Sequence, residues 1–352
     1  MGNEAGRGIH GHDTIVIGAS EGGLEALQTL VRTFSADLPA AVFIVMHIGI
    51  RSHLTEILGK KSALPVLSAE SGAPVRTGTI TVAPPGKHLL IHDGHMLLRR
   101  GPRENMARPA IDPLFRTAAA SRGGRVIGVV LSGNLNDGTA GLRAIKRCGG
   151  LAVVQDPEDA AVPAMVRSAL RHVDVDHVQP IDGMGDLLSE LARKPAPPTP
   201  EIPLEIRVES TIAAQELATM ELEEELGELS PFSCPECNGV LWEVNDGSML
   251  RYRCHVGHAF TAETVLSARA AEVDRMLESL LRSHQERAAL VRRMAQHERS
   301  LQNDSLAAQL EARAEEYEHD AEVVRRLARH GRPTEGDEGE FLRNEAAEEQ
   351  ET

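Results

Sequence analysis

The chain has 352 residues, 41% of them hydrophobic, which is enough for one sizeable globular domain with smaller modules. Its formal net charge of −15 and its aromatic content of 3% argue against nucleic-acid binding through a basic field or through base stacking. With no apolar stretch of about 18 residues and no secretory signal at the start, we expect a cytoplasmic protein without membrane insertion.

Residues 12–190 alternate apolar runs with helical patterns. The clearest strand candidates are short and rich in Val and Ile: "TIVIGAS", "AAVFIVMHI", "RVIGVVLSG" and "LAVVQD". Helical patterns follow in "GLEALQTLVRTF", "DPLFRTAAASR" and "GTAGLRAIKRCGG", and "HDGH" marks a hairpin. Strands that alternate with helices predict an α/β fold with a doubly wound, mainly parallel sheet. The near-continuous apolar runs indicate strands that are covered on both faces.

The composition changes after residue 190. Residues 191–230 are first proline-rich and then acidic, which is typical of a linker. Residues 231–262 form a compact Cys/His segment. Residues 263–331 carry two long helical patterns with a break near "HERSLQND", which predicts a helical hairpin or short coiled coil. Residues 332–352 are acidic, and we expect them to be disordered.

The first strand candidate runs into "GASEG", which matches the G-x-S-x-G pattern of a nucleophile elbow. Gly18 and Gly22 would let the backbone turn sharply around Ser20. The amides at the start of the next helix could hold a developing oxyanion. A phosphate-binding turn of a dinucleotide enzyme looks similar, so this pattern alone leaves both interpretations open.

Two further residues favour the esterase interpretation. A dinucleotide site usually has an acidic residue at the end of the second strand, but this strand ends in His47. Asp137 lies in the loop after "RVIGVVLSG". A lone histidine or an Asp-Gly pair is more often structural than catalytic. Ser20, His47 and Asp137, however, each follow the carboxyl end of a parallel strand, where active sites of open α/β sheets form. Together they predict a Ser-His-Asp triad.

Five blocks in order extend this pattern: "IVIGASEGGLEAL", "VFIVMHI", "VAPPGKHLLI", "RPAIDPLFRTAA" and "VVLSGNLNDGTAGLRAIKRCGG". Over residues 12–190 they resemble the catalytic domain of the protein-glutamate methylesterases, the chemotaxis demethylase family. The resemblance implies a signal-transduction hydrolase that cleaves glutamate γ-methyl esters on chemoreceptors and, in some members, deamidates glutamines.

The resemblance also implies residue roles. Ser20 would be the nucleophile, His47 the general base and Asp137 the orienting acid. The backbone amides of Glu21 and Asn134 would form the oxyanion hole. Neither a metal nor another cofactor would be needed for catalysis, and the protein partners would be methylated chemoreceptor-like proteins.

The chain departs from the family pattern at several points. Glu21 stands where a small residue or Thr is usual, and its carboxylate could repel the oxyanion. "SGNLNDG" replaces a Gly-Met-Gly loop, and Met165-Val166 replaces a Met-Pro pair. Because the pattern begins near residue 12, we expect a stand-alone form without the receiver domain. These departures support a second hypothesis, a catalytically weak or inactive signalling scaffold. A dinucleotide-binding enzyme is a weaker third.

Other residues in these blocks have simpler interpretations. We expect His88 and Arg108 to be structural rather than to line a substrate groove. Asp112, before Pro113, is a good N-cap for the helix that follows. Cys148 should be a small buried residue near a helix end.

The remaining cysteines predict a structural zinc site. "CPEC" places Cys234 and Cys237 on one knuckle, and after sixteen intervening residues "CHVGH" supplies Cys254 and a histidine. His258 suits the fourth position, since His255 is adjacent to Cys254 and would strain the chelate. The intervening "GVLWEVNDGSMLRYR" predicts a hairpin, and hence a zinc-ribbon-like module. Its acidic surroundings favour other signalling proteins, not nucleic acid, as partners of this module and of the helical hairpin.

Overall fold

The computed structural model describes residues 11–47, 53–215, 227–247 and 249–330 of the chain. The chain divides after Val265 into two compact units, 1–265 and 266–352. None of the helices within the described ranges is long and apolar enough to cross a membrane. The predicted tail at 332–352 lies outside the described residues.

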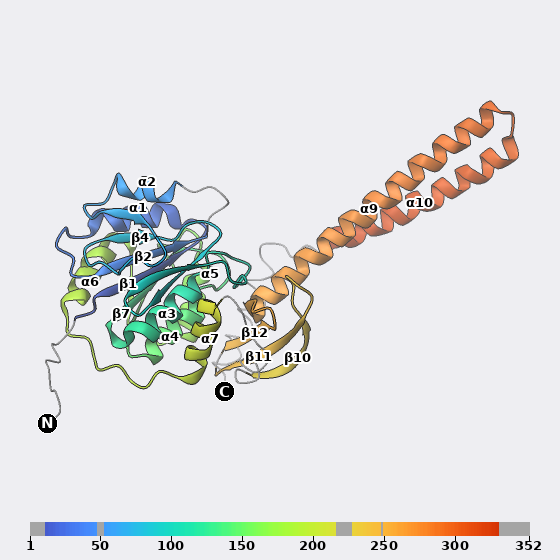
Figure 1. Ribbon diagram of the computed structural model, residues 1–352. Coiled ribbons are helices and arrows are strands. Elements are labelled where there is room, and N and C mark those ends of the chain that lie inside the picture. Colours follow the sequence, from blue (N-terminus) through green and yellow to red (C-terminus); the bar gives the residue numbers. More distant parts are fainter. Residues whose placement is uncertain (1–10, 48–52, 216–226, 248, 331–352) are drawn as a thin grey trace, which may run out of the picture. The chain divides into compact units, whose positions relative to one another are not determined.

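A seven-stranded parallel sheet forms the centre of the first unit, in the order β3-β4-β2-β1-β7-β8-β9 (Figure 1). Its strands are β1 (Thr14–Ala19), β2 (Ala41–Met46), β3 (Val66–Ser68), β4 (Ile80–Val82), β7 (Val126–Val130), β8 (Leu151–Gln155) and β9 (His177–Gln179). All four predicted strands are present. The short edge strands β3 and β9 were not predicted, since three residues carry too little periodicity.

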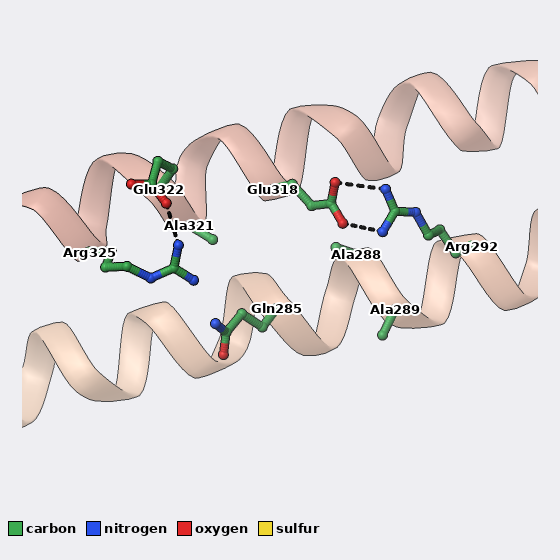
Figure 2. A pocket seen from close by; sticks show the side chains of 8 residues that line it. All are labelled: Gln285, Ala288, Ala289, Arg292, Glu318, Ala321, Glu322 and Arg325. Atoms are coloured by element: carbon green, nitrogen blue, oxygen red, sulfur yellow. Dashed lines mark hydrogen bonds and ion pairs between the residues drawn. The ribbon is translucent and has the colours of Figure 1, made fainter.

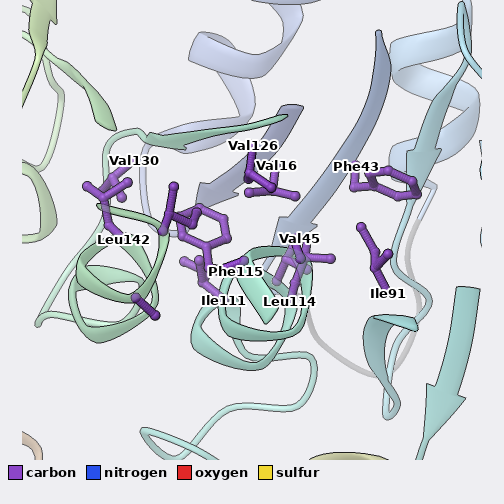
Figure 3. Close-up of a cluster of buried hydrophobic side chains, with 14 of the residues drawn as sticks. Val16, Phe43, Val45, Ile91, Ile111, Leu114, Phe115, Val126, Val130 and Leu142 are labelled. Carbon is purple, nitrogen blue, oxygen red and sulfur yellow. The ribbon is translucent and has the colours of Figure 1, made fainter. Parts of the chain in front are cut away.

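Six helices cover the sheet on both faces: α1 (Gly23–Thr33), α2 (Leu54–Gly59), α3 (Ile111–Arg122), α4 (Thr139–Arg147), α5 (Ala164–His172) and α6 (Ile181–Arg193). Ile15 and Ile17 of β1 pack in one core with α1, α2 and α6. Val16 points the other way, into a core with α3, α4 and α5 that is filled by Phe43, Phe115 and others (Figure 3). This alternation along one strand confirms the doubly wound α/β fold.

A separate hairpin, β5 (His88–His92) and β6 (His95–Arg99), turns at Asp93-Gly94. The apolar face of this hairpin, which includes the buried Leu89 and Ile91, packs on α3. His92 and His95 are exposed at the turn of the hairpin that the "HDGH" pattern predicts.

The segment predicted as a linker contains a helix. Residues 204–215 form α7 (Leu204–Gln215), which carries buried Ile206, Val208 and Ile212 and a buried carboxylate, Glu209. The linker prediction is wrong here, because Glu209 is stabilised by arginines from distant segments that local composition cannot reveal: Arg116, Arg251 and Arg253.

A four-stranded antiparallel sheet follows, in the order β10-β11-β12-β13. Its strands are β10 (Gly227–Ser233), β11 (Val240–Asp246), β12 (Met249–Cys254) and β13 (Ala259–Thr261). Asp246 pairs with Met249 at the hairpin turn. We call residues 227–265 the C-terminal module of the first unit.

Two long helices, α9 (Ala262–Ser300) and α10 (Asp304–His330), make up the described part of the second unit beyond Val265. They run antiparallel, with bidentate pairs between Arg292 and Glu318 and between Arg299 and Glu311. A hollow of about 380 Å³ lies between them. Figure 2 shows the alanines, Gln285 and the charged side chains that line it. Those charges pair with one another, so none of them indicates a bound ligand.

Candidate active site

The turn after β1 presents Ser20. Gly22 has a φ of 71°, a left-handed conformation that favours glycine, and α1 starts at the next residue. The Ser20 amide donates to the Ser132 carbonyl at 2.9 Å, which ties the turn to the loop after β7. The hydroxyl of Ser132 donates to the Glu21 carbonyl at 2.9 Å. The nucleophile turn is thus held by two hydrogen bonds to Ser132.

The structure brings Ser20, His47 and Asp137 together at the carboxyl edge of the sheet. Ser20 Oγ lies 3.0 Å from His47 Nδ1, and His47 Nε2 lies 2.7 Å from Asp137 Oδ2. The backbone N–H of His47 donates to the Ala19 carbonyl at 3.1 Å. The pairing of β1 with β2 therefore fixes the backbone position from which the imidazole ring extends. The tautomer that fits has Nε2–H donating to Asp137 and Nδ1 accepting from the serine. The two ring nitrogens are exchanged relative to chymotrypsin-type triads.

Asp137 is fully buried and held as a carboxylate. Oδ2 accepts from the Ile111 amide at 2.6 Å, and Oδ1 accepts from Asn105 Nδ2 at 3.0 Å. Burial alone would raise the pKa of Asp137, but the hydrogen bond and charge of His47 and these donors lower it to about 2. Asp137 is therefore ionised at neutral pH and can stabilise an imidazolium.

Asp112 does not cap its own helix, so that prediction is wrong. Helix α3 begins at Ile111, and Asp112 reaches across to accept from the amides of Gly138 and Gly141, at 3.0 and 2.7 Å, at the start of α4. Asp137 in turn accepts from the first amides of α3, so the two carboxyl groups cap each other's helices. Burial and the adjacent Asp137 charge raise the pKa of Asp112 well above its usual range.

The amides of Glu21 and Asn134 face no acceptor among the described residues. Both residues are exposed; Glu21 follows Ser20 in the chain, and Asn134 follows Gly133, where an added Cβ would come 2.8 Å from Ser20 Cβ. Paired backbone N–H groups next to a nucleophile are the donors an oxyanion hole requires. The Glu21 side chain is itself exposed, so water screens its charge.

Gly133 lies where the two loops touch. A Cβ there would come 2.8 Å from Ser20 Cβ and 2.0 Å from Met165 Sδ. Met165 could rotate, but the Ser20 Cβ cannot move without shifting the nucleophile. We expect Gly133→Ala to lower kcat about 100-fold with little change in KM, because a shift of about 1 Å misaligns the attack. Steady-state kinetics on an ester substrate would measure this, with Gly59→Ala as the control, because a Cβ at Gly59 would come no closer than 3.8 Å to Val66 Cβ. An unchanged kcat would contradict the close approach.

His88 and Arg108 have structural roles, as predicted. His88 is buried between the Pro102 carbonyl, 2.9 Å from Nε2, and the Ala110 amide, 3.2 Å from Nδ1. Burial lowers the pKa of His88. Arg108 donates to the Gly101 carbonyl at 2.7 Å. Cys148 is buried, which raises the pKa of its thiol to about 11 and makes it unreactive.

Cys234, Cys237, Cys254 and His258 form one group in the C-terminal module, with all ligand atoms within 4.8 Å of one another. Cys237 Sγ lies 3.6 Å from Cys254 Sγ, and His258 Nδ1 lies 3.4 Å from Cys254 Sγ. A tetrahedral zinc with Zn–S bonds of about 2.3 Å places its ligand atoms about 3.5–3.8 Å apart, so the donor set and spacing fit zinc. His255 is exposed and outside the group.

Sequence analysis missed Asn105 and Ser132. Ser132 holds the nucleophile turn, and Asn105 bridges Asp112 and Asp137. Both act on partners remote in the chain, and neither belongs to a motif by itself. The only available signal for Ser132 was its position inside a block that resembles a known family, and Asn105 lies outside all five blocks.

Comparisons with known proteins identify the family of this segment. Residues 15–188 match the family model described as CheB methylesterase. A putative protein-glutamate methylesterase/protein-glutamine glutaminase of Leptospira interrogans is 40% identical over 183 residues, 51% of this chain and 95% of the relative. Protein-glutamate methylesterase/protein-glutamine glutaminase 2 of Anaeromyxobacter dehalogenans is also 40% identical, but the match spans only 54% of its length. The crystal structure of the Thermotoga maritima CheB methylesterase catalytic domain has 31% identity and a TM-score of 0.49, covering 51% of this chain and 98% of that one.

Proposed function

The chain belongs to the CheB methylesterase family, and from that membership we propose that residues 15–188 hydrolyse glutamate γ-methyl esters on chemoreceptor-type signalling proteins. The observation that carries the proposal is the hydrogen-bonded chain from Ser20 through His47 to Asp137. The names of the relatives also include glutaminase, so deamidation of receptor glutamines is included as a second reaction of the same site.

The proposed mechanism is acyl transfer. His47 Nδ1 takes the hydroxyl proton as Ser20 Oγ attacks the ester carbonyl, and Asp137 stabilises the resulting imidazolium. The amides of Glu21 and Asn134 would donate to the oxyanion. Collapse of the tetrahedral intermediate expels methanol, which takes its proton from His47. In the second half of the reaction, His47 takes a proton from water as the water attacks the acyl-serine, and then returns the proton to Ser20 Oγ. No step requires a metal or another cofactor.

Glu21 gives a test of the oxyanion position. Removing its charge should favour the negatively charged transition state, but only weakly, because the side chain is exposed. We expect Glu21→Gln to raise kcat about two- to fivefold at low ionic strength, with the gain disappearing as salt is added. A rate series from low to high salt measures this. A fall in kcat would mean that the carboxylate helps catalysis and that the oxyanion lies elsewhere.

The scaffold hypothesis is not favoured, since every triad contact is present despite the altered residues. A serine-directed fluorophosphonate would test the proposal directly. Intact-mass analysis should show one adduct, peptide mapping should place it on Ser20, and His47→Ala should abolish labelling. Failure of the wild type to react would support the scaffold. Tight nucleotide binding in its place would support a dinucleotide enzyme.

A structural zinc ion held by Cys234, Cys237, Cys254 and His258 is the second part of the proposal. Four Cys/His ligands leave no open position for substrate, so the metal would stabilise the fold of the module. We expect the purified protein to contain stoichiometric zinc, and Cys254→Ser to lose it, by elemental analysis. The matched control is Cys148→Ser, outside the group. Equal zinc in all three proteins would contradict the assignment. We propose that this module and the α9–α10 pair bind other signalling proteins.

A further inference from the structure

Asn105 lies in contact with the acid of the triad. Its Nδ2 donates to Asp137 Oδ1 and to Asp112 Oδ2, both at 3.0 Å, and the residue is 8% exposed. Asn105 and Met106 have φ values of 49° and 63°, a left-handed conformation that non-glycine residues adopt at a cost. Contacts from elsewhere must therefore hold this loop in place.

Those contacts come from β13 of the C-terminal module. The backbone N–H of Asn105 donates to the Ala259 carbonyl at 2.8 Å, and the backbone N–H of Thr261 donates to Asn105 Oδ1 at 3.2 Å. Because Thr261 binds the side-chain oxygen of Asn105, the side-chain nitrogen must face the two carboxyl groups. The module thus sets which end of the Asn105 side chain meets Asp137.

The module also holds the residue before Asp137. Asn136 is buried and its Oδ1 accepts from Thr261 Oγ1 at 2.7 Å. Its Nδ2 donates to Glu263 Oε2 at 2.8 Å. Thr261 therefore reaches the triad acid along two routes, one through Asn105 and one through Asn136.

The metal-ligand group lies directly before this strand. β13 starts at Ala259, the residue after His258, and the Cys254 amide donates to the His258 carbonyl at 3.0 Å. The 254–258 loop that a metal would fix is also the segment that places Ala259 and Thr261. Cys234, Cys237 and Cys254 form no disulfide among the described residues, so a bound metal would be the bond that joins the two knuckles.

We propose that the C-terminal module is an activating part of the esterase site, in which Asn105 and Asn136 are positioning residues and zinc loading sets kcat through Thr261. This inference rests on the proposed function. It predicts that the module acts on the orientation of Asp137 and His47, not on substrate binding. The effect should therefore appear in kcat and leave KM nearly unchanged.

The test uses the full chain, zinc-loaded, with Thr261→Val, Asn105→Ala and the control Thr211→Val, which removes an exposed hydroxyl on α7. We expect Thr261→Val to lower kcat about tenfold and Asn105→Ala about 100-fold, with KM within twofold and with Thr261→Ser restoring most of the loss. The downfield proton signal of the His47–Asp137 hydrogen bond should shift or broaden in the two impaired variants. Thr211→Val should match the wild type in all readouts.

Zinc removal by a chelator gives the second arm. It should lower kcat of the wild type about tenfold or more, reversibly on adding zinc, but change Asn105→Ala less, because that variant has already lost one of the two routes from Thr261 to Asp137. Circular dichroism on each sample separates this from global unfolding. Wild-type kcat and an unchanged proton signal in both zinc-loaded variants would overturn the inference. A wild type that neither releases methanol nor reacts at Ser20 would instead contradict the proposed function. The proton signal would still show whether Asn105 and Thr261 position the His47–Asp137 pair.

Discussion

Asp137→Asn should reduce kcat by about 10⁴-fold while leaving the fold intact. The carboxylate accepts a 2.7 Å hydrogen bond from His47 Nε2, which keeps Nδ1 free to accept the Ser20 proton. An asparagine that keeps the Oδ1 contacts would place its amide nitrogen at the Oδ2 position, where it loses the bond from the Ile111 amide, presents N–H to the ring and selects the wrong tautomer. It would also remove the charge that stabilises the imidazolium. Rates of methyl ester hydrolysis, with zinc content and circular dichroism as checks, measure the effect.

Asp93→Asn is the matched control for that substitution. Asp93 is exposed in the β5–β6 turn with a φ of 45°, which asparagine tolerates. It should hydrolyse substrate at the wild-type rate. If Asp137→Asn retained more than about a tenth of the wild-type kcat, Asp137 would not be the orienting acid, and the triad would have to be revised.

Arg253→Met should lower the free energy of unfolding by about 3–5 kcal/mol. Arg253 is 1% exposed and contacts Glu104 of the esterase segment and Glu209 of α7, at 3.2 and 2.7 Å. Its loss leaves two buried carboxylates with less positive charge around them, which is costlier than removing the entire network. Urea denaturation followed by circular dichroism measures the difference.

The buried network explains the size of that effect. It contains three carboxyl groups and three guanidinium groups in contact, and every side chain in it is at most 8% exposed. Its members are Glu104, Arg116, Glu209, Asp246, Arg251 and Arg253. The control Arg103→Met breaks a pair with Glu236 in which the arginine is 47% exposed, and it should cost about 1 kcal/mol or less. Equal costs for the two variants would show that burial of the network does not set the cost of losing an arginine.

The triad could be predicted because three of its determinants are local. Ser20, His47 and Asp137 each follow an apolar strand, and the parallel sheet brings the carboxyl ends of these strands to one edge. The strands themselves were recognisable from continuous Val and Ile. The cysteine spacing worked in the same way, since two close pairs define a four-ligand group without knowledge of the fold.

The parts that failed depend on distant partners. Asp112 looked like a local cap, but the fold places α4 against α3 and offers it better donors. The 204–215 segment looked like a linker, because the arginines that stabilise Glu209 come from α3 and β12. Arg253 and Glu104 are separated by 149 residues, so no local pattern connects them. A charged residue can be recognised as buried only when the fold shows which opposite charges surround it.

The most direct test of the account is methanol release from methyl-esterified receptor cytoplasmic fragments, by wild-type protein and by Ser20→Ala. The hydrogen-bonded triad predicts release by the wild type and loss of about 10⁴-fold or more in the variant, with both proteins folded and zinc-loaded. Equal release by the two proteins would mean that Ser20 is not the nucleophile. No release by the wild type, from several receptor fragments and over long incubation, would contradict the methylesterase assignment.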